Sequence, residues 1–225
     1  GFLKVNSIRA HRLWAYVEEQ VPYTLVNALV GIEGQYEFSM AGDTPHLAIS
    51  NTTVTLDDVK VATSKAHQPF VDITKITLGP LDFNLGKQKL NIRKLVVDAI
   101  TLKVDRNSQG ELALLAPLSS LPSPPPDRPE SDASETDDTT PFKWSIDKLL
   151  INNSQVNVAD RQPAMPADIE INTINAHING LSQDLSKNIS FGVSYLIQNS
   201  GKSEITGKMV PAPFSLKAAL NLDDI

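Results

Sequence analysis

The 225-residue sequence contains no cysteine, and this absence removes several kinds of chemistry. Without a thiol, the chain has no disulfide framework, no thiolate metal site and no cysteine nucleophile. The four histidines are too far apart to form a metal-ligand pair at the usual i+2 or i+4 spacing; they are His11, His46, His67 and His177. The sequence also has no phosphate-binding glycine loop and no nucleophile elbow. We therefore expect no metal, no cofactor and no enzymatic activity.

Long apolar runs and aromatic residues are also scarce. No run approaches the roughly 20 apolar residues of a membrane-spanning helix, and the first residues lack the apolar region of a signal peptide. Aromatic residues make up 6% of the chain, although 41% of it is apolar. An apolar content supplied mainly by valine, isoleucine and leucine favours a pleated, all-β structure.

The net charge of −6 is concentrated in residues 117–141. This segment contains six acidic residues, one basic residue and seven of the fifteen prolines, which leaves about −1 for the rest of the chain. It is too polar to bury its own surface, so we interpret it as a linker or surface loop between residues 1–116 and 142–225. A nearly neutral body has no electrostatic footprint for nucleic acid, and we expect no nucleic-acid partner.

Apolar and polar residues alternate on both sides of this segment, which is the pattern of strands with one apolar face. Turn residues such as Gly86-Lys87 and Pro211-Ala212-Pro213 separate the alternating stretches at short intervals. Connections this short predict an antiparallel meander, continued across the linker as one sheet. A single short helix is expected at about residues 7–20, where Ser7 could cap a stripe that includes Trp14 and Tyr16.

The alternation breaks repeatedly, because apolar residues recur at a three-residue step. The steps are Leu56 to Val59, Ile73 to Ile76, Ile92 to Leu95, Ile146 to Leu149 and Ile171 to Ile174. A three-residue step moves the next side chain to the opposite face unless the extra residue forms a bulge. Because bulges increase the twist of a sheet, we expect a long, curled sheet whose apolar face lines a groove.

An apolar groove needs cover, since exposing a whole sheet face to water is unfavourable. A second sheet, a partner chain or an apolar ligand could supply this cover. The candidate lining comprises Phe83, Leu85, Ile100, Leu102, Val104, Val156, Val158, Phe191, Val193, Tyr195, Leu216 and Leu220.

One stretch occurs twice in the chain. Residues 92–106 read IRKLVVDAITLKVDR, and residues 146–161 read IDKLLINNSQVNVADR, with one residue inserted at Ala159. Both copies end on an Asp-Arg pair, Asp105-Arg106 and Asp160-Arg161, just before a turn. A turn cap or cross-strand ion pair is the structural interpretation of these pairs, and contact with a lipid headgroup or other ligand is the alternative.

The pattern as a whole resembles the AsmA-like proteins of the Gram-negative envelope. It is most similar to the large periplasmic branch of this family, which is classified as a domain of unknown function. In the C-terminal half the resemblance rests on Pro141-Phe142, Ile146 to Leu149, Val156 to Arg161, Ile174 to Leu181, Ile205 to Lys208 and Phe214 to Ala218. In the N-terminal half it rests on Leu13 to Tyr16, Gly34 to Phe38, Leu56 to Val59, Pro69-Phe70 and Gly110 to Leu112.

This resemblance implies a groove that carries the acyl chains of phospholipids or similar lipids between the inner and outer membranes and supports envelope integrity. It implies a periplasmic location, with this chain as an internal fragment of an inner-membrane-anchored protein that reaches both membranes through other parts. The alternative is a structural or carbohydrate-binding, adhesive β-sandwich of the cell envelope. Such a module would close its apolar faces on each other and bind sugars through exposed aromatic residues. A hydrolase using scattered acidic residues ranks third.

Overall fold

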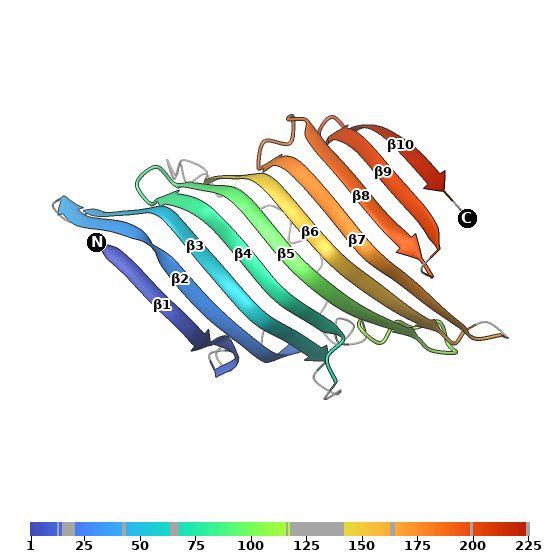
Figure 1. Cartoon of the computed structure of the whole chain (residues 1–225). Coiled ribbons are helices and arrows are strands. Elements are labelled where there is room, and N and C mark those ends of the chain that lie inside the picture. The colour runs from blue at the N-terminus through green and yellow to red at the C-terminus, as the bar shows by residue number, and fades with distance from the viewer. Residues whose placement is uncertain are drawn as a thin grey trace, which may run out of the picture.

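The computed structural model contains one twisted sheet of ten strands (Figure 1). It describes residues 1–12, 14, 21–41, 44–63, 68–115, 117, 142–162, 165–198 and 200–223. The strands are β1 (Phe2–Arg9), β2 (Tyr23–Ala41), β3 (Thr44–Thr63), β4 (Val71–Asn84), β5 (Lys89–Arg106), β6 (Lys143–Asp160), β7 (Ala167–Ser182), β8 (Ile189–Ile197), β9 (Gly201–Val210) and β10 (Ser215–Asp223). The all-β fold expected from the alternating sequence is confirmed.

The strands follow one another in chain order from β1 to β10, so the two halves of the chain form a single sheet. Eight of the nine neighbouring pairs are antiparallel, as expected of a meander. The exception is β5 and β6, which run parallel. The purely antiparallel prediction was therefore wrong at this pair. A parallel neighbour needs a long connection, and residues 107–142 are long enough to provide it.

This parallel pair brings the two copies of the repeated stretch side by side. Lys89 lies opposite Lys143, and the same offset of 54 residues continues without a break to Arg106 opposite Asp160. The inserted Ala159 lies beside Asp105, so the two Asp-Arg pairs are out of step by one position. As a result, Arg106 of one copy faces Asp160 of the other, and their side chains form an ion pair at 3.4 Å.

The three-residue steps are aligned across neighbouring strands in two rows. The first bulge row comprises Leu78 to Leu81, Ile92 to Leu95, Ile146 to Leu149 and Ile178 to Leu181. The second bulge row comprises Leu56 to Val59, Ile73 to Ile76, Val97 to Ile100 and Ile151 to Ser154. Within the second row, Asp58, Ala99 and Asn153 have positive φ angles of 51°, 53° and 45°. At these three positions a left-handed residue absorbs the extra position of the step.

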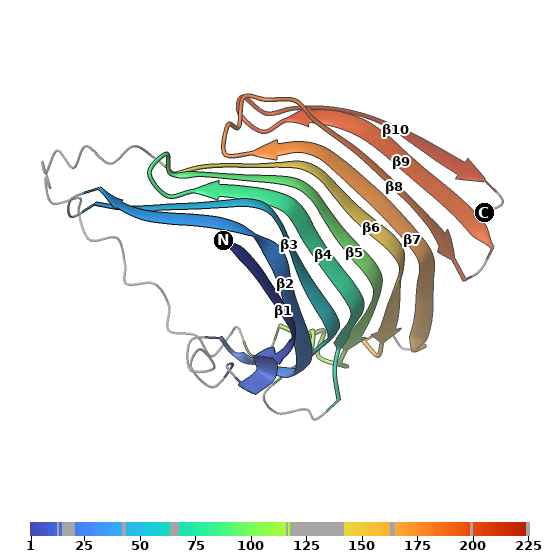
Figure 2. The ribbon, with the colours of Figure 1, turned by 60° about the vertical axis from the view of Figure 1, so that its left-hand side comes forward.

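The bulge rows account for the curvature of the sheet, which bends across its strands (Figure 2). Each step places two side chains on the polar face between successive side chains of the apolar face. The polar face therefore has the longer path, and the sheet bends toward its apolar face. The apolar face is the inner side of the resulting groove.

The predicted N-terminal helix is largely absent from the part of the chain that the structure describes. Residues 7–9 belong to β1, and Ser7 has a positive φ of 57° beside a register shift between Val5 and Ile8. Ala10–Arg12 form one 3-10 turn, η1. Residue 13 and residues 15–20 lie outside the described residues, as do residues 118–141 of the predicted linker. Ser7 and the beginning of the apolar stripe, which were interpreted as a capped helix start, therefore belong to β1 over residues 7–9.

We predict that Ala99→Gly stabilises the protein by about 0.5–1 kcal/mol, because the φ of +53° is unfavourable for an L-residue and accessible to glycine. Urea denaturation measures the change. The matched control is Ala159→Gly, at a position in β6 where the backbone does not have positive φ. There, glycine should destabilise by about 0.5–1 kcal/mol. Equal effects at the two alanines would contradict the role given to the left-handed residue.

Candidate functional site

The candidate site is the apolar face of the sheet, which continues from strand to strand through the pairing register. One row of directly paired residues runs across seven strands: Ile32, Val54, Leu78, Leu95, Leu149, Ile178 and Phe191. A second row crosses six strands: Val61, Val71, Leu102, Val156, Ile171 and Ile197. No charged side chain interrupts either row.

Eleven of the twelve residues predicted from the sequence to line a groove lie on this face. They are Phe83, Ile100, Leu102, Val104, Val156, Val158, Phe191, Val193, Tyr195, Leu216 and Leu220. Leu85 lies in the turn just after β4, where its backbone amide donates to the carbonyl of Leu47 at 2.9 Å, and it is 40% exposed. The alternation of Leu81, Phe83 and Leu85 continued one residue beyond the strand.

Sequence reasoning missed much of the centre of the face, including Leu78, Leu95, Leu149 and Ile178. These residues flank the bulges, where simple alternation fails. The three-residue steps contained the necessary signal: if the apolar residue after each step is assigned to the same face as the one before it, these residues are found.

The face is not covered by a second layer of the described residues, which form a single sheet. Few of its side chains are fully buried, among them Val59, Leu81, Ile92 and Ile189. Those near the edges are the most exposed, such as Phe38 at 60% and Leu220 at 60%. Between β1, β2 and β3 the face contains a depression of about 340 Å³ lined by Leu3, Ile32, Gly34, Gln35, Tyr36, Leu47, Ile49 and Thr52.

The ends of residues 107–142 approach the sheet from the side of this face. After β5, the backbone carbonyl of Leu114 accepts a hydrogen bond of 2.9 Å from the hydroxyl of Tyr23 in β2. Before β6, the ring of Phe142 lies 6.3 Å from that of Phe83, centroid to centroid. Phe83 belongs to the apolar face. The connection therefore leaves β5 and enters β6 in contact with groove residues.

Three polar residues interrupt the apolar face, and two of them complete the bulges. Thr52 follows the left-handed Asn51 and donates its hydroxyl to the carbonyl of Ser50. Ser154 follows the left-handed Asn153 and is 4% exposed. Ser203, between Tyr195 and Leu222, is 1% exposed, and its hydroxyl makes no hydrogen bond to a described residue.

The hydroxyl of Ser154 links the bulges of the two parallel strands. It donates to the carbonyl of Asn152 at 3.2 Å and accepts from the amide of Ile100 at 3.0 Å. The bulge at Ala99 removes the Ile100 amide from the regular ladder, so this side chain supplies its partner. An asparagine followed by a hydroxyl residue at a three-residue step is the sequence signal by which such a link could have been predicted.

We predict that Ser154→Ala destabilises the protein by about 1–3 kcal/mol, because the buried amide of Ile100 loses its partner. Urea denaturation monitored by circular dichroism gives the free energy of unfolding. In the control Ser194→Ala, the replaced serine lies on the polar face of β8, and the change should stay within about 0.5 kcal/mol. Similar losses in both variants would show that the Ser154 hydroxyl has no special role.

The polar face is held by exposed charge pairs rather than by packing. Asp57 and Lys75 pair at 3.3 Å, and Asp82 and Arg93 pair at 3.1 Å, across β3, β4 and β5. The backbone amide of Asn51 donates to the Asp82 carboxylate and, together with Arg93, lowers the pKa of Asp82 below its usual value of 3.8. This amide belongs to a left-handed residue, so the carboxylate supports a bulge as well as an ion pair.

The lowered pKa of Asp82 makes its contribution to stability dependent on pH. Its folded pKa lies below the usual value, so the contribution is complete above about pH 4 and is lost as the pH falls below 3.8. We predict that Asp82→Asn lowers the melting temperature at neutral pH and that the difference from the unchanged protein narrows in acid. A difference that remains constant down to pH 2 would contradict this role.

Three residues of the two Asp-Arg pairs form ion pairs: Arg106, Asp160 and Arg161. Arg106 pairs with Asp160, and Arg161 pairs with Asp168 of β7 at 2.7 Å. In the described part of the chain, no group of three or more histidine, aspartate or glutamate side chains could hold a metal ion. The described residues also include no helix long and apolar enough to cross a membrane.

Comparisons with known proteins identify no relative of this chain. No family model matches it, and neither a curated protein nor a solved structure does so. Any function assigned to the chain therefore depends on the geometry of the sheet.

Proposed function

We propose that this chain is a non-catalytic groove segment that carries the acyl chains of phospholipids or similar lipids. The observation that supports this proposal is the apolar face, which continues across all ten strands and has no cover from the described residues. Fully burying one aliphatic side chain is worth about 1.5–3 kcal/mol. A row of half-exposed side chains therefore favours an apolar occupant strongly.

The chemistry of the face suits a sliding occupant. Its centre is aliphatic, with rows such as Leu78, Leu95 and Leu149, and contains few aromatic rings. Aliphatic contacts are similar along the whole groove, whereas aromatic anchors with polar groups would hold one ligand in a fixed pose. A sliding acyl chain can therefore exchange its contacts with one row of side chains for similar contacts with the next row.

The location follows from the same proposal. In the AsmA-like proteins that the sequence resembles, such a groove would lie in the periplasm and connect the inner and outer membranes through parts outside this chain. The repeated strands of the two halves, joined in register at β5 and β6, are consistent with a groove built from successive modules. We propose the periplasm as the location on this basis.

The alternative, a β-sandwich that binds carbohydrate or mediates adhesion, requires a second sheet to cover the apolar face. The described residues form one sheet, which favours the groove. The groove also explains why side chains of this face in the edge strand β10, such as Leu220 at 60%, remain exposed.

The proposal predicts that lipid co-purifies with the protein and that a charge on the apolar face removes it. Native mass spectrometry of the purified chain should detect bound phospholipid. Leu102→Glu places a carboxylate between Val71 and Val156 in the middle of a row. Because a charge is unfavourable beside acyl chains, it should reduce lipid binding at least about tenfold.

The matched control is Thr101→Glu, which changes the neighbouring residue on the polar face of the same strand. Val193→Glu and Ser194→Glu form a second pair in β8. Circular dichroism verifies that all four variants fold. Loss of lipid from Leu102→Glu and Val193→Glu alone supports the groove. Absence of lipid from the unchanged protein, or equal binding by both members of each pair, refutes it.

A further inference from the structure

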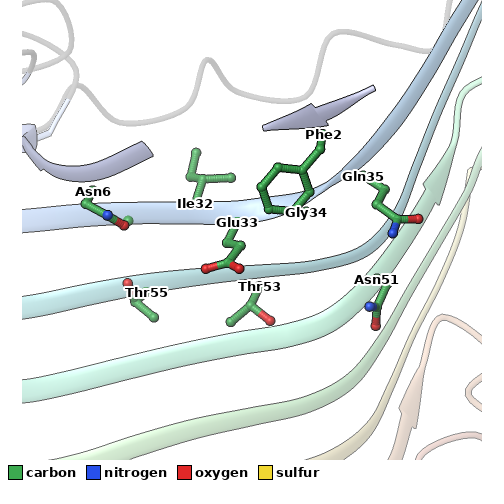
Figure 3. Close-up of a pocket in the computed structure, with 10 residues that line it drawn as sticks. Phe2, Asn6, Ile32, Glu33, Gly34, Gln35, Asn51, Thr53 and Thr55 are labelled. Atoms are coloured by element: carbon green, nitrogen blue, oxygen red, sulfur yellow. The ribbon is translucent and has the colours of Figure 1, made fainter. Parts of the chain in front are cut away.

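A second depression lies on the polar face, opposite the proposed groove, between β1, β2 and β3 (Figure 3). Its volume is about 440 Å³. The residues that line it are Phe2, Asn6, Gly31, Ile32, Glu33, Gly34, Gln35, Asn51, Thr53 and Thr55. Lipid carriage on the other face of the sheet makes no use of this depression.

Gly31 lies at the floor of the depression. It lies opposite Thr55 in the register of β2 and β3. A Cβ atom at this position would lie 2.6 Å from the Thr55 hydroxyl oxygen, so the hydroxyl occupies space that any larger residue would take. The Thr55 hydroxyl therefore lies against the backbone of β2 and provides a polar group at the floor of the depression.

The side chains around this floor have unused hydrogen-bonding capacity. Asn6, Gln35, Asn51, Thr53 and Thr55 make no side-chain hydrogen bond to another described residue, although each lines the depression. Figure 3 shows these side chains around the ribbon of β2, which lies between β1 and β3. Amide and hydroxyl groups both donate and accept, so the lining can match a ligand that does the same.

Charge gives this depression a nearly neutral character. Glu33 provides the one carboxylate in the lining, and it pairs with Lys4 of the neighbouring strand at 2.8 Å. A single, already neutralised carboxylate gives little affinity for a metal cation, and the lining contains no basic side chain to attract an anion. The depression suits a neutral, hydroxyl-rich ligand.

Phe2 is the least expected member of the lining. It alternates with Leu3, which faces the groove, and lies on the same side of β1 as Lys4 and Asn6. Its ring is therefore exposed on a face otherwise occupied by polar side chains, at 62% of its surface. Packing within the sheet gives no reason for an aromatic ring there. A ring beside amide and hydroxyl groups combines an apolar surface for C–H groups with hydrogen bonds for hydroxyls.

We propose that this depression is a saccharide-binding site, with the sugar ring stacked on Phe2 and its hydroxyls bonded to Asn51, Gln35 and Thr53. The volume fits one sugar unit or two, and the shallow shape allows the site to bind a residue within a longer glycan. Binding on the polar face leaves the groove free, so the sheet can hold a glycan on one side and acyl chains on the other.

The test is a titration of the isotopically labelled chain with glucose, N-acetylglucosamine and maltose, followed by amide NMR. At least one sugar should shift the amides of Gly31, Thr53 and Thr55 in a saturable way. Sorbitol, an open-chain polyol that has the hydroxyls but no sugar ring, should not do so. The proposal is overturned if no sugar shifts these amides, or if sorbitol has the same effect.

Variants with matched controls locate the site. Phe2→Ala should weaken binding about threefold to tenfold through loss of stacking. Phe38→Ala is its control, because this ring is similarly exposed, at 60%, but lies on the apolar face. Asn51→Gly removes the amide while keeping a residue that tolerates the left-handed backbone, and Asn153→Gly makes the same change at the equivalent conformation in β6.

The expected result is weaker sugar binding by Phe2→Ala and Asn51→Gly and unchanged binding by Phe38→Ala and Asn153→Gly. Unchanged binding by the first two variants would place the sugar elsewhere and refute the site. The lipid measurement is separate, since Leu102→Glu should leave sugar binding intact and Phe2→Ala should leave lipid binding intact. The site and the groove can therefore fail independently.

Discussion

Alignment of the extra residues in neighbouring strands keeps one face of this sheet apolar. A single bulge in one strand would shift its side chains to the opposite face relative to its neighbours. Here β4 and β5 have their three-residue steps side by side, Leu78 to Leu81 and Ile92 to Leu95. The register between the two strands is therefore the same before and after the steps. Register, curvature and the apolar face therefore depend on the same feature.

The parallel pair carries this alignment from one half of the chain to the other. The antiparallel neighbours β4 and β5 align steps from different stretches of sequence, Leu78 to Leu81 beside Ile92 to Leu95. In parallel register, an offset of 54 residues places each bulge of β6 beside the corresponding bulge of β5. Ser154 then completes both at once through its bonds to Asn152 and Ile100. The repetition in the sequence thus aligns the steps of the two copies where they lie side by side.

Much of the fold could be predicted from the sequence because its information is local. Alternation around Leu102 and Val193 correctly assigned those strands to an apolar face, and the steps at Leu56 and Ile171 indicated bulges. The parallel pair could not be found in this way, since alternation does not encode which strand lies beside which. The stretch after Ser7 was interpreted as a helix from a possible cap and an apolar stripe, whereas residues 7–9 continue β1 with Ser7 in a left-handed conformation.

The candidate sites differ in how far sequence could reveal them. The groove follows from a pattern repeated over ten strands, so most of its lining could be predicted. The depression on the polar face could not, because its members come from three strands and none forms a motif. Phe2 attracts attention only once Leu3 and Lys4 are known to face opposite sides of β1.

The two bulge rows also determine where the sheet can deform. A regular ladder resists bending because every amide is paired along the strand, whereas the second row contains left-handed residues such as Asp58 and Ala99 that interrupt this pairing. We therefore expect the sheet to bend more easily along the bulge rows than elsewhere. Opening or narrowing the groove then requires bending at the two bulge rows, and the strand segments between them keep their hydrogen-bond pairing as the width changes.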